Sequence, residues 1–116
     1  MFLTLNHQKL EVFKVSRKFV MECYRLTKQL PSDEKFGMIS QIRRAALSVH
    51  LNIAEGASRK SETERKRYYE VSRGSIIEID AALDIAKALN YLDELDLEAL
   101  GISMLQCFKL LSGMIN

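Results

Sequence analysis

The segment spanning residues 39–56 repeats apolar side chains at the spacing of an α-helix, and this periodicity constrains the fold more than any other feature of the chain. The apolar positions are separated by three or four residues: Ile39, Ile42, Ala46, Val49, Ile53 and Gly56. Side chains at this spacing share one stripe of a helix and pack against a core. The segment is therefore predicted to be a core helix.

Two further series of side chains occupy the same predicted helix. A polar series lies about 130° from the core stripe and comprises Gln41, Arg44, Ser48, Asn52, Glu55 and Arg59. A third, apolar face consists of Leu47, Leu51 and Ala54, and it is flanked by Arg43 and His50. Because one core requires only one apolar stripe, the additional apolar face predicts contacts beyond a single bundle.

The rest of the chain also favours long helices. It contains one proline and five glycines in 116 residues, of which 47% are hydrophobic and 28% charged. This balance is typical of one globular domain that needs no disulfide or metal for stability. Residues 1–116 are therefore predicted to form a single domain, and apolar periodicity predicts helices over residues 7–29, 33–58 and 62–89 and from residue 93 onward.

Four helices joined by short connections predict an all-α fold with neighbouring helices in opposite directions. The expected architecture is an antiparallel up-down-up-down four-helix bundle. Ser61, followed three residues later by Glu64, is predicted to cap the third helix through a capping box. Asp93 is predicted to cap the fourth helix, whose first turn is rich in acidic residues.

The predicted third helix has the same surplus of apolar faces as the second. Its second stripe consists mostly of small residues: Gly74, Ile77, Ala81, Ile85 and Ala88. Small residues let helix backbones approach closely, so we expect a homo-oligomer. The predicted interface residues are Arg43, Leu47, His50, Leu51, Asn52, Glu55, Gly74, Ile77 and Ala81.

Asn52 and Glu55 are interpreted as structural residues, which bond to neighbouring helix ends or to a second subunit. In an alternative interpretation, Asn52 and Glu55 contact a protein partner. In that alternative the protein is an adaptor that works without nucleic acid, such as an accessory subunit of a larger complex, and the polar series engages a protein partner.

The sequence lacks the patterns of common catalytic and metal sites. His7 and His50 are the only histidines, and neither lies three residues after a glutamate, as the metal sites of helical bundles require. Ser48, Ser72 and Ser75 lie inside predicted helices without a histidine at helical spacing. A glycine-rich phosphate loop is also lacking. We therefore expect a protein that is not an enzyme and binds no metal or cofactor.

The cysteines and the apolar segments predict a cytoplasmic protein. Cys23 and Cys107 are the only cysteines, and both occupy apolar helical positions, so they are predicted to be reduced and buried. No window approaches 18 uninterrupted apolar residues, and the first eight residues do not resemble a signal peptide. Association with a membrane is accordingly not expected.

Charge is divided unequally along the chain. Residues 1–60 hold eleven Lys or Arg against five acids, a net +6, whereas residues 61–116 hold six against ten, a net −4. Basic side chains neutralise phosphates and tyrosines stack on unpaired bases, so RNA is the expected ligand. The candidate RNA-binding residues are Arg43, Arg44, Arg59, Lys60, Arg65, Lys66 and Arg67. The alternative interpretation is a solvated face with helical pairs such as Glu62 and Lys66.

Several motifs resemble those of the 23S rRNA-intervening sequence protein family. They are Leu30-Pro31, Gln-Ile-Arg-Arg-Ala-Ala at residues 41–46, Asn-Ile-Ala-Glu-Gly at residues 52–56, and Gly74-Ser75 with Glu78. The resemblance covers about residues 6–115, and it implies a four-helix bundle of uncharacterised molecular role that forms a homo-oligomer, a pentameric ring. It also implies a distant likeness to accessory bundles that work with a reverse transcriptase and RNA. His50-Leu51 departs from the smaller or different pair that the family pattern leads us to expect.

Overall fold

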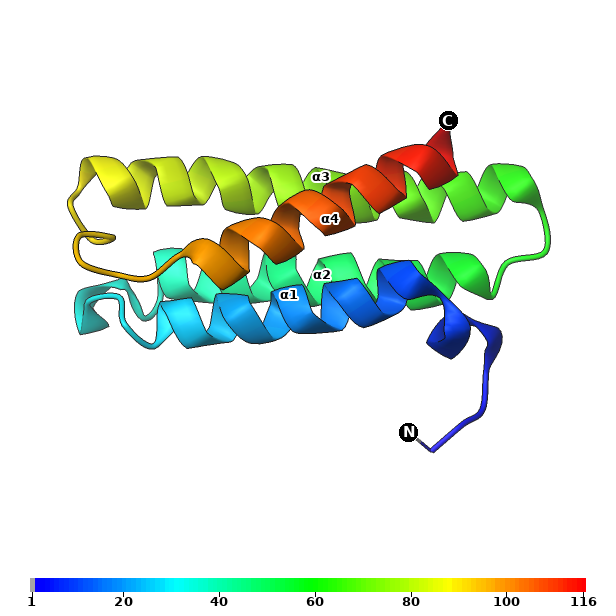
Figure 1. Cartoon of the computed structure of the whole chain (residues 1–116), viewed down its shortest axis with the longest axis horizontal. Helices are drawn as coiled ribbons and strands as arrows, with labels where there is room; N and C mark the ends of the chain where they lie inside the picture. Colours follow the sequence, from blue (N-terminus) through cyan, green and yellow to red (C-terminus); the bar gives the residue numbers. More distant parts are fainter. Residues whose placement is uncertain (1) are drawn as a thin grey trace.

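A computed structural model describes residues 2–116, which form four α-helices and two short 3₁₀ turns (Figure 1). The helices are α1 (Glu11–Thr27), α2 (Met38–Ala57), α3 (Glu62–Ala88) and α4 (Glu98–Ile115). The 3₁₀ turns are η1 (Asn6–Lys9), before α1, and η2 (Ser32–Glu34), before α2. Residues 2–116 contain no β-strand. The predicted all-α class with four helices is confirmed.

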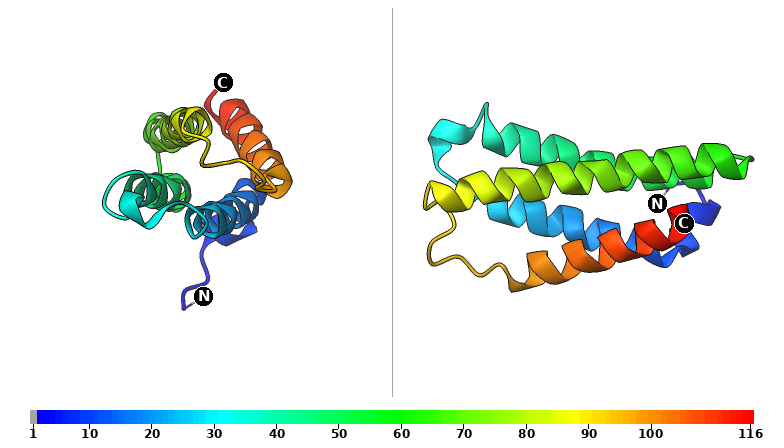
Figure 2. Two further views of the ribbon diagram at one scale, coloured as in Figure 1. Left: turned by 90° about the vertical axis from the view of Figure 1, so that its left-hand side faces the viewer. Right: turned by 90° about the horizontal axis from the view of Figure 1, so that it is seen from above.

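The four helices surround one core, as the end-on view of Figure 2 shows. Each helix packs against two others, so that α1, α2, α3 and α4 follow one another around the core and α4 returns to α1. Contacts between α2 and α3 pair Val49 with Ser72 and Arg44 with Glu78. Contacts between α1 and α2 pair Ser16 with His50.

The core contains the stripe predicted for residues 39–56. Five of its six positions are buried, and Ile39 at the start of α2 is half-buried. The other helices add large buried side chains at helical spacing: Val12, Phe19, Cys23 and Leu26 from α1, Ile76 and Ile79 from α3, and Leu100, Cys107 and Leu111 from α4. Their burial provides the main stabilisation of the fold.

Both cysteines are free thiols in this core, which confirms the prediction. Burial raises the pKa of Cys23 from 9.0 to about 12, and burial raises the pKa of Cys107 to about 12 as well. The protonated thiol is therefore the stable form in the folded protein at neutral pH, and both side chains act as small apolar groups.

Three predicted helix boundaries are wrong. The first α-helix begins at Glu11 rather than residue 7, because Leu10 has an extended backbone that separates η1 from α1. The second begins at Met38 rather than residue 33, because Gly37 interrupts the helical backbone after η2. The fourth begins at Glu98 rather than residue 93.

The late start of α4 also removes the predicted role of Asp93 as its cap. Asn90 and Glu94 have left-handed backbones, with φ of 63° and 66°, so the chain turns through this connection instead of continuing as helix. The backbone N–H of Glu98 donates to the carboxylate of Asp96 at 3.0 Å, and Asp96 thus supplies the polar partner at this end.

The start of α3 agrees with the sequence. Ser61 is its N-cap, and its hydroxyl accepts a hydrogen bond from the backbone N–H of Glu64 at 3.0 Å. Further along α3, Tyr69 is buried in the core, whereas its neighbour Tyr68 is only half-buried. Both tyrosines lie against Gly56, where a Cβ atom would be 2.8 Å from Tyr69 and 2.9 Å from Tyr68. Gly56 therefore sets how closely α2 and α3 approach.

Replacing Gly56 by alanine is expected to destabilise the protein by about 1–3 kcal/mol, because the added methyl group overpacks the contact with both tyrosines. Gly101→Ala is the control, since Gly101 is exposed inside α4 and a Cβ there meets no heavy atom within 4 Å. That variant is expected to gain up to about 1 kcal/mol from helix propensity. Urea unfolding followed by circular dichroism measures both, and equal effects would contradict the role given to Gly56.

Candidate nucleic-acid interface

The arrangement of the helices separates charge along the long axis of the molecule. The start of α1, the end of α2, the start of α3 and the end of α4 lie at the same end, on the right in Figure 1. When each helix is divided near its middle, this end comprises residues 2–19, 48–75 and 107–116. It holds eleven Lys or Arg against five acids, a net +6, and the opposite end holds six against ten, a net −4. We call these the basic end and the acidic end.

The connection between α2 and α3 supplies many of the cations of the basic end. Arg59 lies 2.6 Å from the carboxylate of Glu55, donates to the hydroxyl of Tyr68 at 3.0 Å, and lies over the Tyr68 ring. Arg65 donates to the backbone carbonyl oxygens of Arg59 and Lys60 at 3.1 and 2.8 Å. These two arginines therefore stabilise the turn itself.

The other cations of this connection are more accessible. Lys66 forms an ion pair with Glu62 at 3.3 Å, as the helical spacing predicted. The side chains of Lys60 and Arg67 are exposed, and within residues 2–116 neither makes an ion pair or a side-chain hydrogen bond. Of the predicted RNA-binding residues, these two are free to meet a phosphate without breaking an existing contact.

The structure does not bring Arg43 and Arg44 together with this group. Arg43 turns toward α1, where its Nε donates to Thr27 at 2.8 Å and its guanidinium lies 4.8 Å from the centre of the Tyr24 ring. Arg44 forms an ion pair with Glu78 of α3. Both lie about 20 Å before the end of α2 at Ala57, along the helix axis. A ligand of the basic end therefore meets them only if it extends along the bundle.

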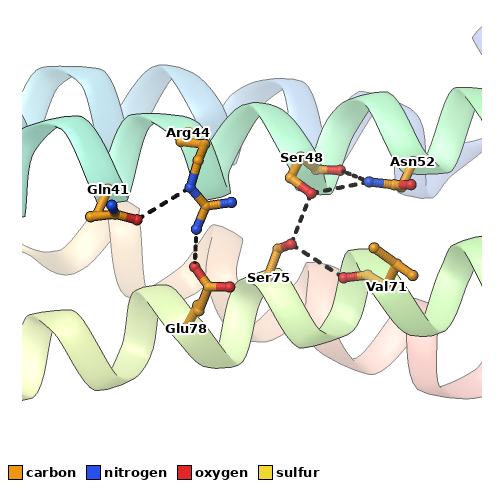
Figure 3. A network of polar contacts seen from close by, with 7 residues as sticks. All are labelled: Gln41, Arg44, Ser48, Asn52, Val71, Ser75 and Glu78. Atoms are coloured by element: carbon orange, nitrogen blue, oxygen red, sulfur yellow. Dashed lines mark hydrogen bonds and ion pairs between the residues drawn. The ribbon is translucent and has the colours of Figure 1, made fainter.

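The polar series of α2 lies along the seam with α3 (Figure 3). Arg44 donates to the side-chain oxygen of Gln41 at 3.2 Å, in addition to its ion pair with Glu78. Asn52 donates to the backbone carbonyl and the hydroxyl of Ser48, at 2.8 and 3.0 Å. The Ser48 hydroxyl lies 2.9 Å from that of Ser75 on α3. Asn52 and Glu55 thus have partners within the same chain, where Glu55 pairs with Arg59.

The additional apolar faces of α2 and α3 are not covered by the rest of the chain. Leu47 is 41% exposed, Leu51 60% and Ile77 55%, and Gly74 and Ala81 beside them are exposed too. Two of the predicted interface residues lie elsewhere, because Arg43 and the half-buried His50 contact α1. The exposed apolar residues form a surface over α2 and α3 that a single chain leaves in water.

Sequence reasoning missed a cluster where η1, α1 and α2 meet. The rings of Phe13 and His50 are stacked, with centroids 4.1 Å apart, and the ring of His7 meets Phe13 edge-on at 4.6 Å. Ser16 lies 2.7 Å from Nδ1 of His50. The two histidines stand out in the sequence, but they are 43 residues apart, and nothing in their spacing indicates that both contact Phe13.

The potential metal ligands and the apolar character of α4 bear on two further kinds of function, metal binding and membrane insertion. Within residues 2–116, no three His, Cys, Asp or Glu side chains are grouped so that they could hold a metal ion. Helix α4 is long and apolar enough to cross a membrane by length and composition, with a mean hydropathy of 1.2. In the structure this helix contributes Leu100, Cys107 and Leu111 to the core of the bundle.

The structure is that of a small all-helical protein. Its polar series lies between α2 and α3, and its basic side chains are concentrated at one end. The chain belongs to the 23S rRNA-intervening sequence protein family, because the sequence model of that family matches residues 8–113, nearly the whole chain. The resemblance seen in its motifs is thereby confirmed. A search of curated proteins finds no match.

Replacing Arg65 by alanine is expected to destabilise the protein by about 1 kcal/mol, because the turn between α2 and α3 loses the donor for two backbone carbonyl groups. The exposed Arg67, two residues away, provides the control, and its replacement by alanine should change stability by less than about 0.5 kcal/mol. Thermal unfolding of the two variants checks the difference. Unchanged stability of the Arg65 variant would show that the turn does not depend on it.

Proposed function

We propose that this protein is a non-enzymatic, homo-oligomeric scaffold that binds RNA in the cytoplasm through its basic end. The observation that carries the proposal is the net charge of +6 at that end, which the fold assembles from distant parts of the chain. A concentrated positive potential attracts a polyanion and strengthens its binding at low salt.

The proposed subunit is an antiparallel up-down-up-down bundle. Residue pairs along α2 and α3 support this topology, because Arg44 meets Glu78 whereas Arg59 meets Tyr68, so numbers rise on one helix as they fall on the other. Arg43 with Thr27 and His50 with Ser16 follow the same rule for α1 and α2.

Assembly of subunits uses the exposed apolar residues of α2 and α3. Leu51 and Ile77 are more than half exposed, and a stable interface that covers them would bury about 800 Å² on each partner. Glycine and alanine at positions 74 and 81 allow close approach of a neighbouring helix. A ring of five subunits, which the family resemblance implies, would present several basic ends to one RNA and raise its avidity.

Lys60 and Arg67 are the expected phosphate contacts, because their side chains are exposed and have no acidic partner in the described chain. Lys66 can join them if it leaves Glu62, at little cost for an exposed pair. Arg59 and Arg65 keep the turn in place while adding to the positive potential.

The double variant Lys60→Ala/Arg67→Ala is expected to bind a fluorescein-labelled single-stranded RNA more weakly. If both residues contact phosphates, the slope of log affinity against log salt should fall by about 1.4, which fluorescence anisotropy in a salt series measures. Lys35→Ala/Lys87→Ala removes two cations from the acidic end and serves as the control. RNA binding that is insensitive to salt, or equally weakened by both double variants, would show that the basic end is not the binding site.

Leu47→Asp/Leu51→Asp is expected to convert the oligomer into smaller species, because it places two charges within the proposed subunit interface. Sedimentation velocity at micromolar concentration measures the change. Met21→Asp is the control, since Met21 of α1 is 53% exposed but lies outside that interface. A wild-type protein that sediments as a stable monomer would rule out the proposed assembly.

A further inference from the structure

A cavity of about 700 Å³ opens where η1, α1 and α2 meet, at the basic end. Its lining combines three rings with two cationic side chains and one amide: His7, Gln8, Phe13, Lys14, Arg17 and His50. The volume falls within the range of small-molecule sites in proteins. The lining contains no acidic residue, and the cavity is separate from Lys60 and Arg67.

The three rings form a continuous aromatic column along this cavity. Phe13 stacks on His50 with an angle of 24° between the ring planes, and His7 meets Phe13 at 64°. All three side chains are half-buried, so their positions are supported by the bundle while part of each ring faces solvent. Flat π surfaces of this kind bind nucleobases by stacking, with little preference among bases.

Hydrogen bonding fixes the orientation of the His50 ring. Ser16 is fully buried, and its hydroxyl lies 2.9 Å from the backbone carbonyl oxygen of Phe13 and 2.7 Å from Nδ1 of His50. A hydroxyl has a single proton, so when Ser16 donates to the carbonyl group, Nδ1 of His50 must donate to Ser16. Nε2 is then the nitrogen of His50 that takes up a proton.

The charges around the cavity repel one another. Burial, followed by the charges of His7 and Arg17, lowers the pKa of His50 below its ordinary value of 6.5. Lys14 and Arg17 are exposed, and within residues 2–116 neither forms an ion pair with a carboxylate. A phosphate bound between them would remove this repulsion, since it brings the negative charge that the lining lacks.

A second, neighbouring cavity continues the basic surface along α1. It shares Lys14 with the first cavity and adds Lys9 and Lys18, with Glu11 as the one acidic residue in its lining. Lys9 and Lys18 lie outside the lining of the first cavity, where the adjoining phosphates of a strand can meet them. Because cationic side chains line both cavities, a nucleic-acid strand is favoured as the ligand over a free nucleotide.

We propose that this cavity binds one nucleotide unit of a single-stranded RNA, with the base on the His7–Phe13–His50 column and the phosphate between Lys14 and Arg17. The inference rests on the proposed RNA-binding function but uses residues other than Lys60 and Arg67. Adjoining nucleotides follow α1 past Lys9 and Lys18.

Binding at this site takes up a proton. The bound phosphate raises the pKa of His50 from its lowered value, so between the two values the complex holds a proton that the free protein lacks. Affinity therefore increases as the pH falls toward the pKa of His50 in the complex. The charged groups that face His50 are Arg17 and Lys14 of α1 and His7 of η1, none of which is acidic.

The test measures binding of fluorescein-labelled octauridylate RNA to the full-length protein by anisotropy, with circular dichroism to confirm that each variant folds. Lys14→Ala/Arg17→Ala and Phe13→Leu are each expected to weaken binding about tenfold or more. Arg25→Ala/Lys28→Ala, which removes two cations at the acidic end of α1 and just after it, is the control and should have a smaller effect. His50→Gln should reduce the gain in affinity at lower pH, which a pH series of the same measurement checks.

Three results would overturn the inference. The first is full affinity in Lys14→Ala/Arg17→Ala and Phe13→Leu while Lys60→Ala/Arg67→Ala binds weakly, which leaves the proposed function intact. The second is displacement of the RNA by uridine monophosphate at equal concentrations, which identifies a free-nucleotide site instead. The third is no binding of RNA by the wild-type protein at any salt concentration, which removes the proposed function as well.

Discussion

The close approach of α2 and α3 determines much of this structure. Gly56 leaves no room for a side chain beside Tyr69, and the buried Ser72 hydroxyl donates to the backbone carbonyl of Val49 at 2.7 Å. Backbones this close must match in register, because a buried hydroxyl that loses its partner carries a desolvation penalty. The same register brings Arg44 to Glu78 and Ser48 to Ser75 along the seam. Several residues of the family motifs therefore lie where α2 and α3 meet.

Helical periodicity was sufficient to predict the fold class and most of the core. The stripe from Ile42 to Gly56 is buried as its spacing indicates, because burial of a long helix follows directly from its apolar pattern. The choice between Tyr68 and Tyr69 could not be predicted, since it depends on Gly56 of another helix. The starts of α1 at Glu11 and of α2 at Met38 likewise depend on the backbone angles of the residues before them, Leu10 and Gly37, which apolar periodicity does not reveal.

The candidate site was only partly predictable for a similar reason. The sequence showed a basic first half and an acidic second half, but the relevant division runs across every helix, between the two ends of the bundle. From the sequence alone, Arg43 and Arg44 could not be distinguished from Arg59 as candidate RNA contacts. In the structure, Arg43 bonds to Thr27 of α1 and Arg44 to Glu78 of α3. A charge pattern along a chain becomes a surface only when the topology is known, and periodicity does not supply that information.

The hydrogen bonds that side chains make between helices are distributed unevenly among the four helices. Several join α2 to α3, whereas within residues 2–116 the bond from Arg73 to Ser112 is the one that joins α4 to another helix. The nine residues before α4 form an irregular connection with two left-handed positions. Helix α4 is therefore held mainly by apolar contacts, and a slide or tilt of this helix would break one polar bond, that from Arg73 to Ser112. Opening of the bundle at α4 is therefore expected to cost less free energy than separation of α2 from α3, which several polar bonds hold in register.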